Sequence, residues 1–255
     1  MSSTADRAPL VAVPVYGRLD LVERAVQSID SATDPDVPLL VVDDAGPERL
    51  TELALRGWMT SSREVELVSH PVNLGFVGSA NDIFSRRDGR DVVLVNTDVV
   101  VFDGWLEGLL AARGDETASV TAATNNGSLA TVADGASYAG PDELEPLARQ
   151  ARQGDLPERE LPVCVGHCVL LTNRALREVG GFDPAFAPGY GEEVDWSFRA
   201  ARRGLRHVLA PRTVVWHDGG QSFDRVSVRK RWHEAKILRR HPVGFLRLRG
   251  LWPGA

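Results

Sequence analysis

The pattern of apolar and polar residues along the chain divides it into short apolar runs and longer segments with helical spacing. Apolar runs occupy residues 10–15, 39–42, 65–68, 92–101 and 119–123. Between them, apolar residues recur every three or four positions, as in Leu19, Val22, Val26 and Ile29. Similar spacing predicts helices over 50–56, 79–86 and 105–110. Strands that alternate with helices predict an α/β fold with a mostly parallel sheet and right-handed crossovers.

The run at 92–101 is the centre of this pattern, because it is interrupted by Asn96, Thr97 and Asp98 and then becomes apolar again. Its first four residues are aliphatic, as expected of a strand that is covered on both faces. Ligands of open α/β sheets bind outside the carboxyl ends of the strands. Asp98 is therefore a candidate for holding a divalent cation, with Asn96 supplying a neutral oxygen. The alternative is a plain turn, since all three residue types favour turns.

Two other segments of the first half place polar or flexible residues where strands end. Asp43 and Asp44 directly follow the run at 39–42, so two strands end in carboxylates. Residues 70–78, HPVNLGFVG, contain two glycines before the expected helix at 79–86. These glycines suit a backbone that approaches a ligand closely, and a connecting turn is the alternative.

The second half of the chain is less regular. Residues 124–162 begin with Thr-Asn-Asn-Gly and continue with prolines and scattered acids. We expect an excursion that either contacts a second substrate or forms a surface insertion. A strand at 163–172 and a helix at 173–179 follow, and two glycines end that helix. Two short strands are expected at 207–210 and 213–216, and the second leads into His217, either a metal ligand or a surface histidine.

Three acids, Glu192, Glu193 and Asp195, lie in the first turn of the helix expected after residue 191. The face of this helix that is expected to pack inward consists of Val194, Phe198, Ala201 and Leu205. Acids are favoured at a helix amino terminus, so capping is one explanation for them. One acid would be enough for capping, however. Crowded carboxylates raise the pKa of one member of the group, which is what a general base needs.

Composition and charge narrow the possible functions. The chain has 255 residues, 43% of them hydrophobic, and its net charge is −6, so it can form a large core and lacks the overall basic character of nucleic-acid-binding proteins. Residues 225–249 contain nine bases and one acid, a net +8, which leaves −14 on the rest of the chain. An amphipathic helix is expected at 227–240, with Val228, Trp232, Ala235 and Leu238 on one face. This helix either lies on an anionic membrane or near phosphates, or it caps the structure.

Targeting features and cysteines add two expectations. The sequence contains no apolar run long enough to span a bilayer, and its first ten residues lack the pattern of a signal peptide, so we expect a soluble, cytoplasmic protein. Cys164 and Cys168 flank His167, but only one further ligand would be nearby. Buried small residues are therefore favoured over a metal site at this position.

The order of these motifs resembles the inverting glycosyltransferases of family 2. The matching stretches cover most of residues 8–221; they are VAVPVYGR, LLVVDDAG, HPVNLGFVGSAND, VLVNTDVVV, GHCVLLTNRALREVGGFDPAF, GYGEEVDWSFRAARRG and VVWHDGG. Within the family, NLGF and VGGFD look most like the branch of bacterial rhamnosyltransferases. The resemblance implies a GT-A fold, with a Rossmann-like sheet and a smaller acceptor side, and a nucleotide-diphosphate sugar as donor.

The resemblance also implies a role for each matching position. The residues against the nucleotide base would be Pro14, Val15 and Tyr16, with Asp43 or Asp44 accepting a hydrogen bond from the base or ribose. Those near the nucleotide would be Asn73, Gly75 and Gly78, with Asn81 near the ribose or diphosphate. The metal motif for Mg²⁺ or Mn²⁺ would be Asn96-Thr97-Asp98, with Asp98 as the metal-binding member and His217 completing the shell. The catalytic base would be Glu193.

Two positions depart from the family pattern. Asn96 replaces the first Asp of the metal motif, which lowers the charge at the metal. Glu193 replaces Asp and extends the reach of the base by a methylene, so Asp195 stays a rival for this role, with Glu192 beside it. The implied reaction is an inverting transfer in which the metal neutralises charge on the leaving nucleotide and the base takes a proton from the acceptor hydroxyl.

Three functions remain open at this point. The first is a metal-dependent hexosyltransferase that uses a UDP- or dTDP-sugar in bacterial polysaccharide, glycolipid or natural-product synthesis. The second is a GT-A-like module that binds a nucleotide or glycan without turnover. The third, a nucleotidyltransferase, is disfavoured because residues 12–18 lack a glycine-rich, basic signature.

The expected organisation is one GT-A domain over residues 1–222. Within it, residues 8–123 would bind the nucleotide sugar, and residues 124–222 would form the acceptor side with the base. Residues 223–255 would form a basic helix and tail that contacts the inner face of a membrane peripherally. The expected acceptor is a glycan, a glycolipid or a small molecule, and nucleic acid is not expected as a partner. The sugar, the acceptor and the oligomeric state do not follow from the residues.

Overall fold

The fold is built on one large sheet. The structure, a computed structural model, describes residues 7–127, 129–132, 137–154, 157–219 and 227–250. The strands run in the order β3-β2-β1-β4-β8-β6-β9-β5, and β7 pairs with β9. Their bounds are β1 Leu10–Val15, β2 Leu39–Asp43, β3 Val65–Ser69, β4 Val92–Val95, β5 Val99–Val100, β6 Thr117–Thr124, β7 Arg159–Leu161, β8 Cys168–Leu171 and β9 Arg206–His217.

The first four strands form the parallel half of the sheet, as the apolar runs predicted. β1 pairs in parallel with both β2 and β4, and β2 pairs with β3. The carboxyl ends of these strands therefore meet at one edge of the sheet. The central run is interrupted as expected, since β4 ends at Val95 and a turn carries the chain to β5.

The other half makes the sheet mixed. β8 runs antiparallel to both of its neighbours, β4 and β6. β6 then pairs in parallel with β9, so this strand from the first half of the chain lies between two strands of the second half. The predicted strands at 207–210 and 213–216 are one strand, β9, whose register with β6 shifts where Ala123 pairs with Val214.

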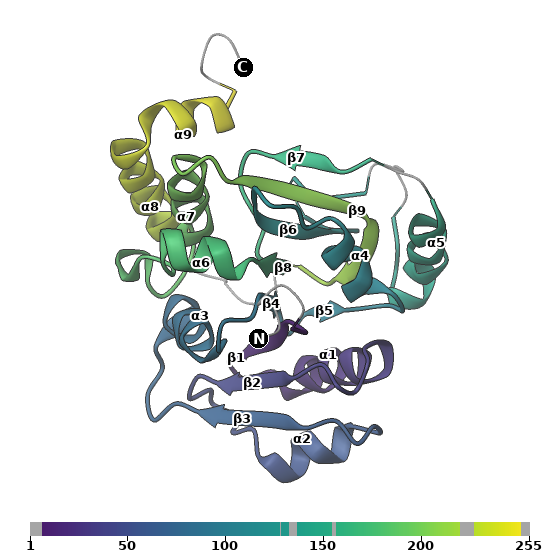
Figure 1. The fold of residues 1–255 in the computed structure, drawn as a ribbon. Coiled ribbons are helices and arrows are strands. Elements are labelled where there is room, and N and C mark those ends of the chain that lie inside the picture. The colour runs from purple at the N-terminus through teal and green to yellow at the C-terminus, as the bar shows by residue number, and fades with distance from the viewer. Residues whose placement is uncertain (1–6, 128, 133–136, 155–156, 220–226, 251–255) are drawn as a thin grey trace.

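Helices cover both faces of the sheet, because its side chains alternate between two apolar cores. Val11, Val13 and Val15 face the core that is covered by α1, α2 and α4, whereas Leu10 and Ala12 face the core covered by α3, α6 and α7. Figure 1 shows these layers on either side of the strands. The bounds are α1 Leu19–Ala32, α2 Glu52–Trp58, α3 Gly75–Arg86, α4 Trp105–Ala111, α5 Pro141–Gln153, α6 Asn173–Val179 and α7 Glu192–Ala201, with a 3₁₀ turn at Pro184–Phe186.

Two predicted elements need correction. Helix α3 begins at Gly75, so the glycines expected in a loop belong to its first turn. The strand expected at 163–172 is only Cys168–Leu171, and Cys164 lies in the loop before it. The described part of the excursion at 124–162 carries α5, which packs on β9, and β7, which pairs with β9.

The inward face of α7 also differs from the prediction. Trp196 and Ala200 are fully buried, whereas Ala201 is exposed. Val194 and Phe198 pack against the same core only partly. Asp195 is buried on the inward face, so a polar residue occupies a position that the apolar pattern could not assign to the core.

Two helices follow the sheet near the end of the chain. α8 spans Ser227–Arg240, as predicted, and α9 spans Pro242–Leu248. Figure 1 shows α8 beside α7, at the opposite end of the molecule from β3 and α2. α8 buries Ile237 and His233 against the body and leaves Trp232 67% exposed. Within the described residues, no helix combines the length and apolar character needed to cross a membrane.

Candidate functional site

A cavity of about 490 Å³ opens at the carboxyl ends of the parallel strands. It lies between the segment after β1, the ends of β2 and β4, and the first turn of α3. Its walls are formed by Pro14, Val15, Tyr16, Arg18, Leu21, Asp44, Asn73, Gly75, Phe76, Ser79, Asn96, Thr97, Asp98 and Pro188. The cavity thus occupies the edge where ligands of open α/β sheets bind.

Most of the residues expected to bind a nucleotide sugar line this cavity. They are Pro14, Val15, Tyr16, Asp44, Asn73, Gly75, Asn96, Thr97 and Asp98. Five further lining residues were not predicted: Arg18, Leu21, Phe76, Ser79 and Pro188. Two of them, Phe76 and Ser79, follow from the early start of α3, since its first turns face the cavity.

Asp44 is held in place by three donors. Its Oδ1 accepts hydrogen bonds from the Leu74 amide at 2.8 Å and from His70 Nδ1 at 2.8 Å, and its Oδ2 accepts one from the Gly75 amide at 2.7 Å. The carboxylate therefore caps the amino terminus of α3, where backbone amides lack partners within the helix. The Asp44 carboxylate thus links the segment after β2 to the start of α3.

His70 links Asp44 to a second carboxylate. Its Nε2 lies 3.2 Å from Asp82 Oδ2, while its Nδ1 is bonded to Asp44. Burial lowers the pKa of this histidine, but the hydrogen bonds that it donates to the two carboxylates raise the pKa overall above its ordinary value. A ring placed between two acids in this way favours the imidazolium form, which can donate from both nitrogens.

Three residues that were expected at the nucleotide do not line the cavity. The side chain of Asp43 is fully buried, and its Oδ1 accepts a hydrogen bond from the Gly46 amide. Gly78 lies inside α3, where a side chain would collide with Leu74. Asn81 uses its amide to donate to the carbonyl and accept from the amide of Phe182, at 2.8 Å each. Its side chain joins α3 to the segment before α7.

Gly75 brings the acceptor side of the chain against α3. Its φ is +72°, and a Cβ atom at this position would overlap Pro188. The Val77 amide donates to the Pro188 carbonyl at 3.3 Å. Only glycine tolerates both this backbone conformation and this close approach. Pro188 consequently forms a wall of the cavity, although it lies more than 110 residues further along the chain.

Asp98 lines the cavity and forms a pair with His217. The carboxylate of Asp98 is buried, and its Oδ2 lies 3.4 Å from His217 Nε2. Burial raises the pKa of Asp98, but the hydrogen bond from His217 holds it below its ordinary value overall. Asn96 and Thr97 occupy the turn between β4 and β5 and line the cavity, so the turn is confirmed and ligand binding stays a prediction.

The loop after β6 fixes the orientation of His217, which the sequence did not reveal. Asn125 accepts from the His217 amide at 2.8 Å and donates to its carbonyl at 3.2 Å. His217 Nδ1 lies 2.6 Å from the Asn126 carbonyl, so this nitrogen carries a proton. Nε2 faces Asp98 and donates to its carboxylate; a bound metal would replace that second proton, while Nδ1–H would stay on the backbone carbonyl, as in most metal-binding histidines. Paired asparagines in an otherwise irregular segment were the available signal.

Asp98 and His217 fit the divalent cation that the family implies. They offer a carboxylate oxygen and an imidazole nitrogen, and Asn96 in the same wall offers a neutral oxygen. Across the described ranges, no cluster of three or more His, Cys, Asp or Glu side chains could hold a metal by itself. Such a site would complete its shell with water or phosphate oxygens, which Mg²⁺ prefers.

The two cysteines, Cys164 and Cys168, are buried and form no disulfide.

The start of α7 carries two carboxyl groups with raised pKa values. Burial raises the pKa of Glu193 to about 7, although the Gly166 amide donates to it. Burial and the neighbouring Glu193 raise the pKa of Glu192 well above its ordinary value, and Glu192 Oε2 has no hydrogen-bond partner among the described residues. Carboxyl groups that are poised near neutral pH are suited to general-base chemistry.

One short loop connects Glu193 to the cavity. The amide of Gly166 contacts Glu193, and the carbonyl of the next residue, His167, accepts from the Asn96 amide at 2.9 Å. The His167 ring also stacks on His217, with centroids 5.2 Å apart. Two consecutive residues therefore tie the candidate base to the turn that carries Asp98.

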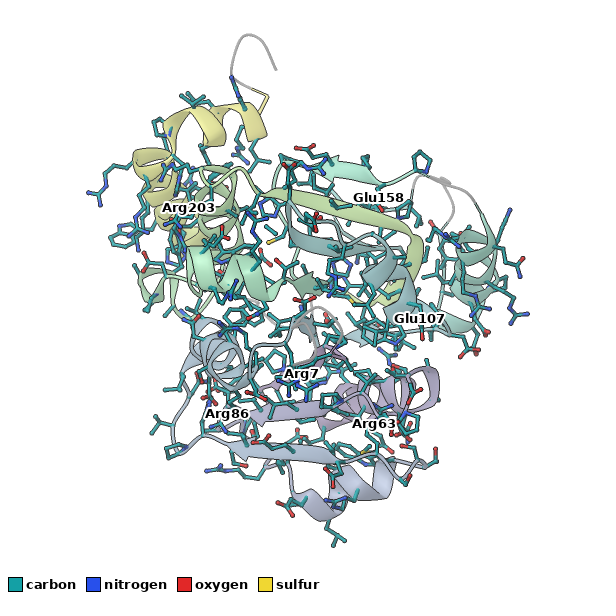
Figure 2. The ribbon with its side chains drawn as sticks, in the orientation of Figure 1. Arg7, Arg63, Arg86, Glu107, Glu158 and Arg203 are labelled. Atoms are coloured by element: carbon teal, nitrogen blue, oxygen red, sulfur yellow. The ribbon has the colours of Figure 1, made fainter. Side chains whose placement is uncertain are left out.

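Asp195 has different surroundings from the two glutamates. Its side chain is 1% exposed, and it accepts hydrogen bonds from Arg199 at 2.8 Å, His241 at 2.9 Å and Arg240 at 3.2 Å. Burial raises its pKa, but these bonds hold the pKa below its ordinary value overall. Asp195 thus anchors α8 and α9 to α7. Figure 2 labels Arg203, which follows α7 at this end of the molecule, and Arg86, the last residue of α3.

Comparisons with known proteins agree with the resemblance. The model of the family described as "Glycosyl transferase family 2" matches residues 10–180. The pre-mycofactocin glycosyltransferase of Mycobacterium tuberculosis is 25% identical over 255 residues, covering 94% of this chain and 50% of the relative. This chain thus spans about half the length of that protein. The N-acetylglucosaminyl-diphospho-decaprenol L-rhamnosyltransferase of the same organism is 26% identical over 251 residues, covering 86% of this chain and 78% of the relative.

Solved structures show the fold. The structure of GalNAc-T7 with UDP, GalNAc and Mn²⁺ matches with a TM-score of 0.68 at 16% identity, over 90% of this chain and 47% of the other. The mannosyltransferase PcManGT of Pyrobaculum calidifontis, in complex with GDP-Man and Mn²⁺, matches with a TM-score of 0.61 at 18% identity, over 98% and 67%. Both are GT-A glycosyltransferases, and this chain shares their α/β fold with its mostly parallel, mixed sheet.

Proposed function

The chain belongs to glycosyl transferase family 2, and on this premise we propose that it transfers a sugar, with inversion, from a UDP- or dTDP-sugar to an acceptor hydroxyl. One observation carries the proposal. One cavity is lined by both Asp44 and Asp98, Asp98 pairs with His217, and the Gly166-His167 loop links the turn that carries Asp98 to Glu193. Such a cavity suits a ligand that carries both a base and a charged diphosphate.

We assign roles to the residues around the cavity by their chemistry. Pro14, Val15 and Tyr16 would lie against the base, and Asp44 would accept a hydrogen bond from it. Asp98 and His217 would hold Mg²⁺ or Mn²⁺, which when bound would neutralise negative charge on the leaving diphosphate. The structures of GalNAc-T7 and PcManGT, which contain Mn²⁺ with a nucleotide or nucleotide sugar, support this assignment.

Glu193 is the proposed base. Its pKa of about 7 lets it accept a proton at neutral pH and still be ionised in a large fraction of molecules. The charge of Glu193 would in turn keep the neighbouring, buried Glu192 protonated. Asp195 is a weaker candidate for the role, since three cationic or hydrogen-bonding side chains already occupy it.

The membrane is the proposed location of the acceptor. α8 exposes Trp232 and Leu238 on the face away from the body, together with Arg231 and Arg239. Aromatic and basic side chains on one helix face favour anionic lipid surfaces. The relative named as acting on a decaprenol-linked diphosphate is consistent with a lipid-linked acceptor. Polysaccharide or glycolipid synthesis would then be the biological setting.

Two experiments test these assignments. For the donor, we would measure binding of UDP and dTDP by calorimetry, with and without Mn²⁺, followed by release of UDP or dTDP from a panel of nucleotide sugars. Metal-dependent binding and release support the transferase. Binding without any turnover would support the alternative, a module that only recognises the nucleotide.

For the tail, we would compare sedimentation with phosphatidylglycerol vesicles. A double variant with Trp232→Ala and Leu238→Ala should bind several-fold more weakly than the wild-type chain. Leu53→Ala is the matched control, because Leu53 is 85% exposed at the opposite end of the molecule, on α2. Equal binding by all three proteins would exclude this face as the membrane contact.

A further inference from the structure

The turn that precedes α7 has an uncommon backbone. Tyr190 has a φ of +77° and Gly191 a φ of +91°, so both lie in the left-handed region. A tyrosine rarely adopts this region, and a residue held there depends on the surrounding structure to keep it in place. Glu192 and Glu193 follow directly as the first two residues of α7. Whatever holds this turn therefore also determines where the proposed base lies.

Helix α8 supports the turn. His233 is 4% exposed, and its Nδ1 lies 2.6 Å from the Tyr190 carbonyl. A carbonyl oxygen can only accept, so the ring nitrogen donates. A Cβ atom on Gly191 would come within 2.9 Å of Ile237 Cδ1, so α8 also packs directly on the turn. The Phe186 ring meets His233 edge-on, with centroids 5.3 Å apart, and holds the imidazole against the carbonyl.

Other side chains of α8 hold this helix to the same segment. Arg240 pairs with Asp183 at 2.6 Å and with Asp195 at 3.2 Å, on either side of the turn along the chain. Lys236 donates to the carbonyl of Ala185. α8 is thus bonded before, at and after the turn, and it can serve as a rigid support for it.

The proposed base has little room to move. The Gly166 amide donates to Glu193, and a Cβ atom on Gly166 would overlap Glu193 Oε1. The carboxylate therefore lies directly against the backbone of the loop that precedes β8. A misplacement of about 1 Å at a reacting group can lower a rate about 100-fold. Glu193 should therefore be sensitive to any shift of the first turn of α7.

We propose that His233 is a positioning residue of the transfer reaction: by holding the Tyr190 carbonyl, it fixes the start of α7 and so the place of Glu193. This inference rests on the proposed function, in which Glu193 is the base. It goes beyond that function because it gives α8 a part in the reaction itself, separate from any contact of its exposed face with lipid. His233 is buried against the body, whereas Trp232 lies on the exposed face.

The first test removes the hydrogen bond and then restores it. His233→Leu has no donor, and it should lower kcat for release of UDP or dTDP, from the nucleotide sugar of the panel that the wild type uses, roughly 10- to 100-fold. His233→Asn places an amide nitrogen where Nδ1 lies and should restore most of kcat. His233→Gln places its amide where Nε2 lies and should not. If His233→Leu does not fold, the contrast between the Asn and Gln variants decides the question.

Nucleotide affinity separates positioning from a general loss of folded protein. Calorimetry of UDP and dTDP with Mn²⁺ should give wild-type affinity for His233→Leu, because the residues that line the cavity lie on other segments. Glu234→Gln is the matched control, since Glu234 neighbours His233 on α8 and its carboxylate pairs with Arg249 at 3.7 Å. It should keep the wild-type kcat and affinity.

A double variant shows whether His233 acts through Glu193. In the Glu193→Gln background, His233→Leu should cause no further loss of kcat, because the group that it positions is already gone. An effect on the fold as a whole would instead multiply with the effect of Glu193→Gln.

The outcomes are distinguishable. Three results would each overturn this inference alone: wild-type kcat in His233→Leu, nucleotide affinity that falls in parallel with kcat, and a multiplied loss in the double variant. Equal kcat in His233→Asn and His233→Gln would do the same. Failure of the wild-type chain to release UDP or dTDP from every sugar of the panel would overturn the proposed function and this inference with it.

Discussion

The two ends of the molecule hold their polar side chains in different ways. At the cavity, backbone groups orient the Asp44 carboxylate, through the Leu74 and Gly75 amides, and the His217 ring, through the Asn126 carbonyl. At the start of α7, Asp195 is oriented by side chains of Arg199 on α7, Arg240 on α8 and His241, which precedes α9. Backbone partners are present whatever residues surround them, whereas side-chain partners must be supplied one by one. The orientation of the polar side chains at the cavity therefore depends on the topology of the sheet, whereas the orientation of Asp195 depends on pairing with charged side chains that are distant in sequence.

The largest expected effect separates the roles of the adjacent acids on α7. Glu193→Gln should lower turnover about a thousandfold, the usual contribution of a general base. It should leave the melting temperature unchanged or higher, since it replaces a buried ionisable carboxyl by a neutral amide of the same shape. Release of UDP or dTDP and thermal melting measure the two effects. A variant that unfolds would point to a structural role for Glu193, and one that keeps its turnover would remove it as the base.

Asp195→Asn should show the opposite behaviour. It leaves Arg199 and Arg240 without their buried carboxylate, so the free energy of unfolding should fall by roughly 3 kcal/mol. Urea denaturation at pH 7 measures this change. Asp183→Asn is the matched control, because Asp183 also pairs with Arg240 but is about one-third exposed. Its loss should be under about 1 kcal/mol. Equal losses in the two variants would contradict the anchoring role of Asp195.

The two hydrogen bonds between the Asn125 side chain and the His217 backbone lead to a third prediction. Asn125→Ala removes both bonds to the His217 backbone and should weaken Mn²⁺ binding about 10- to 100-fold, as losses around metal ligands usually do. Titration of Mn²⁺ by electron paramagnetic resonance measures it directly. Asn126→Ala is the control, because residue 126 orients the ring through its main-chain carbonyl. If the control loses as much affinity, the loop acts through its overall shape instead of through Asn125.

The last prediction concerns the dependence on pH. The raised pKa of Glu193 means that the base is protonated below about pH 7, so kcat/KM should rise roughly tenfold per unit up to that pH and then level off. The same raised pKa makes the folded state less stable as pH rises through 7, because the charged form is buried. Glu193→Gln should therefore gain stability relative to the wild type above pH 7. A flat profile of kcat/KM between pH 5 and 8 would exclude this assignment.

The two ends also differed in how far the sequence predicted them. Strands β1 to β4 and the position of Asp98 could be predicted, because apolar runs that stop at polar residues mark strand ends directly. The antiparallel direction of β8 could not, since an apolar run of four residues is compatible with either direction. The inward face of α7 was misassigned for a related reason. Asp195 is buried only because Arg240 and His241, more than 40 residues later, supply its partners.

The same reasoning explains the misplaced residues near the cavity. Asn81 matched a family motif, but its side chain is used to hold Phe182, a contact between segments 101 residues apart. Asn125 matched no motif, although it orients His217. Local pattern identifies residue types at strand ends, whereas the partner of each side chain depends on how distant segments pack.

The placement of β6 bears on the engineering of new transferases. β6 comes from the first half of the chain but lies between β8 and β9, so every cut through the sheet leaves one half with unpaired strand edges. A chimera that joins the donor half of one transferase to the acceptor half of another would therefore expose unpaired strand edges, and we expect it to aggregate. The practical unit of exchange is the complete sheet. Segments outside it and away from α7, such as α5, are the pieces that recombination could replace.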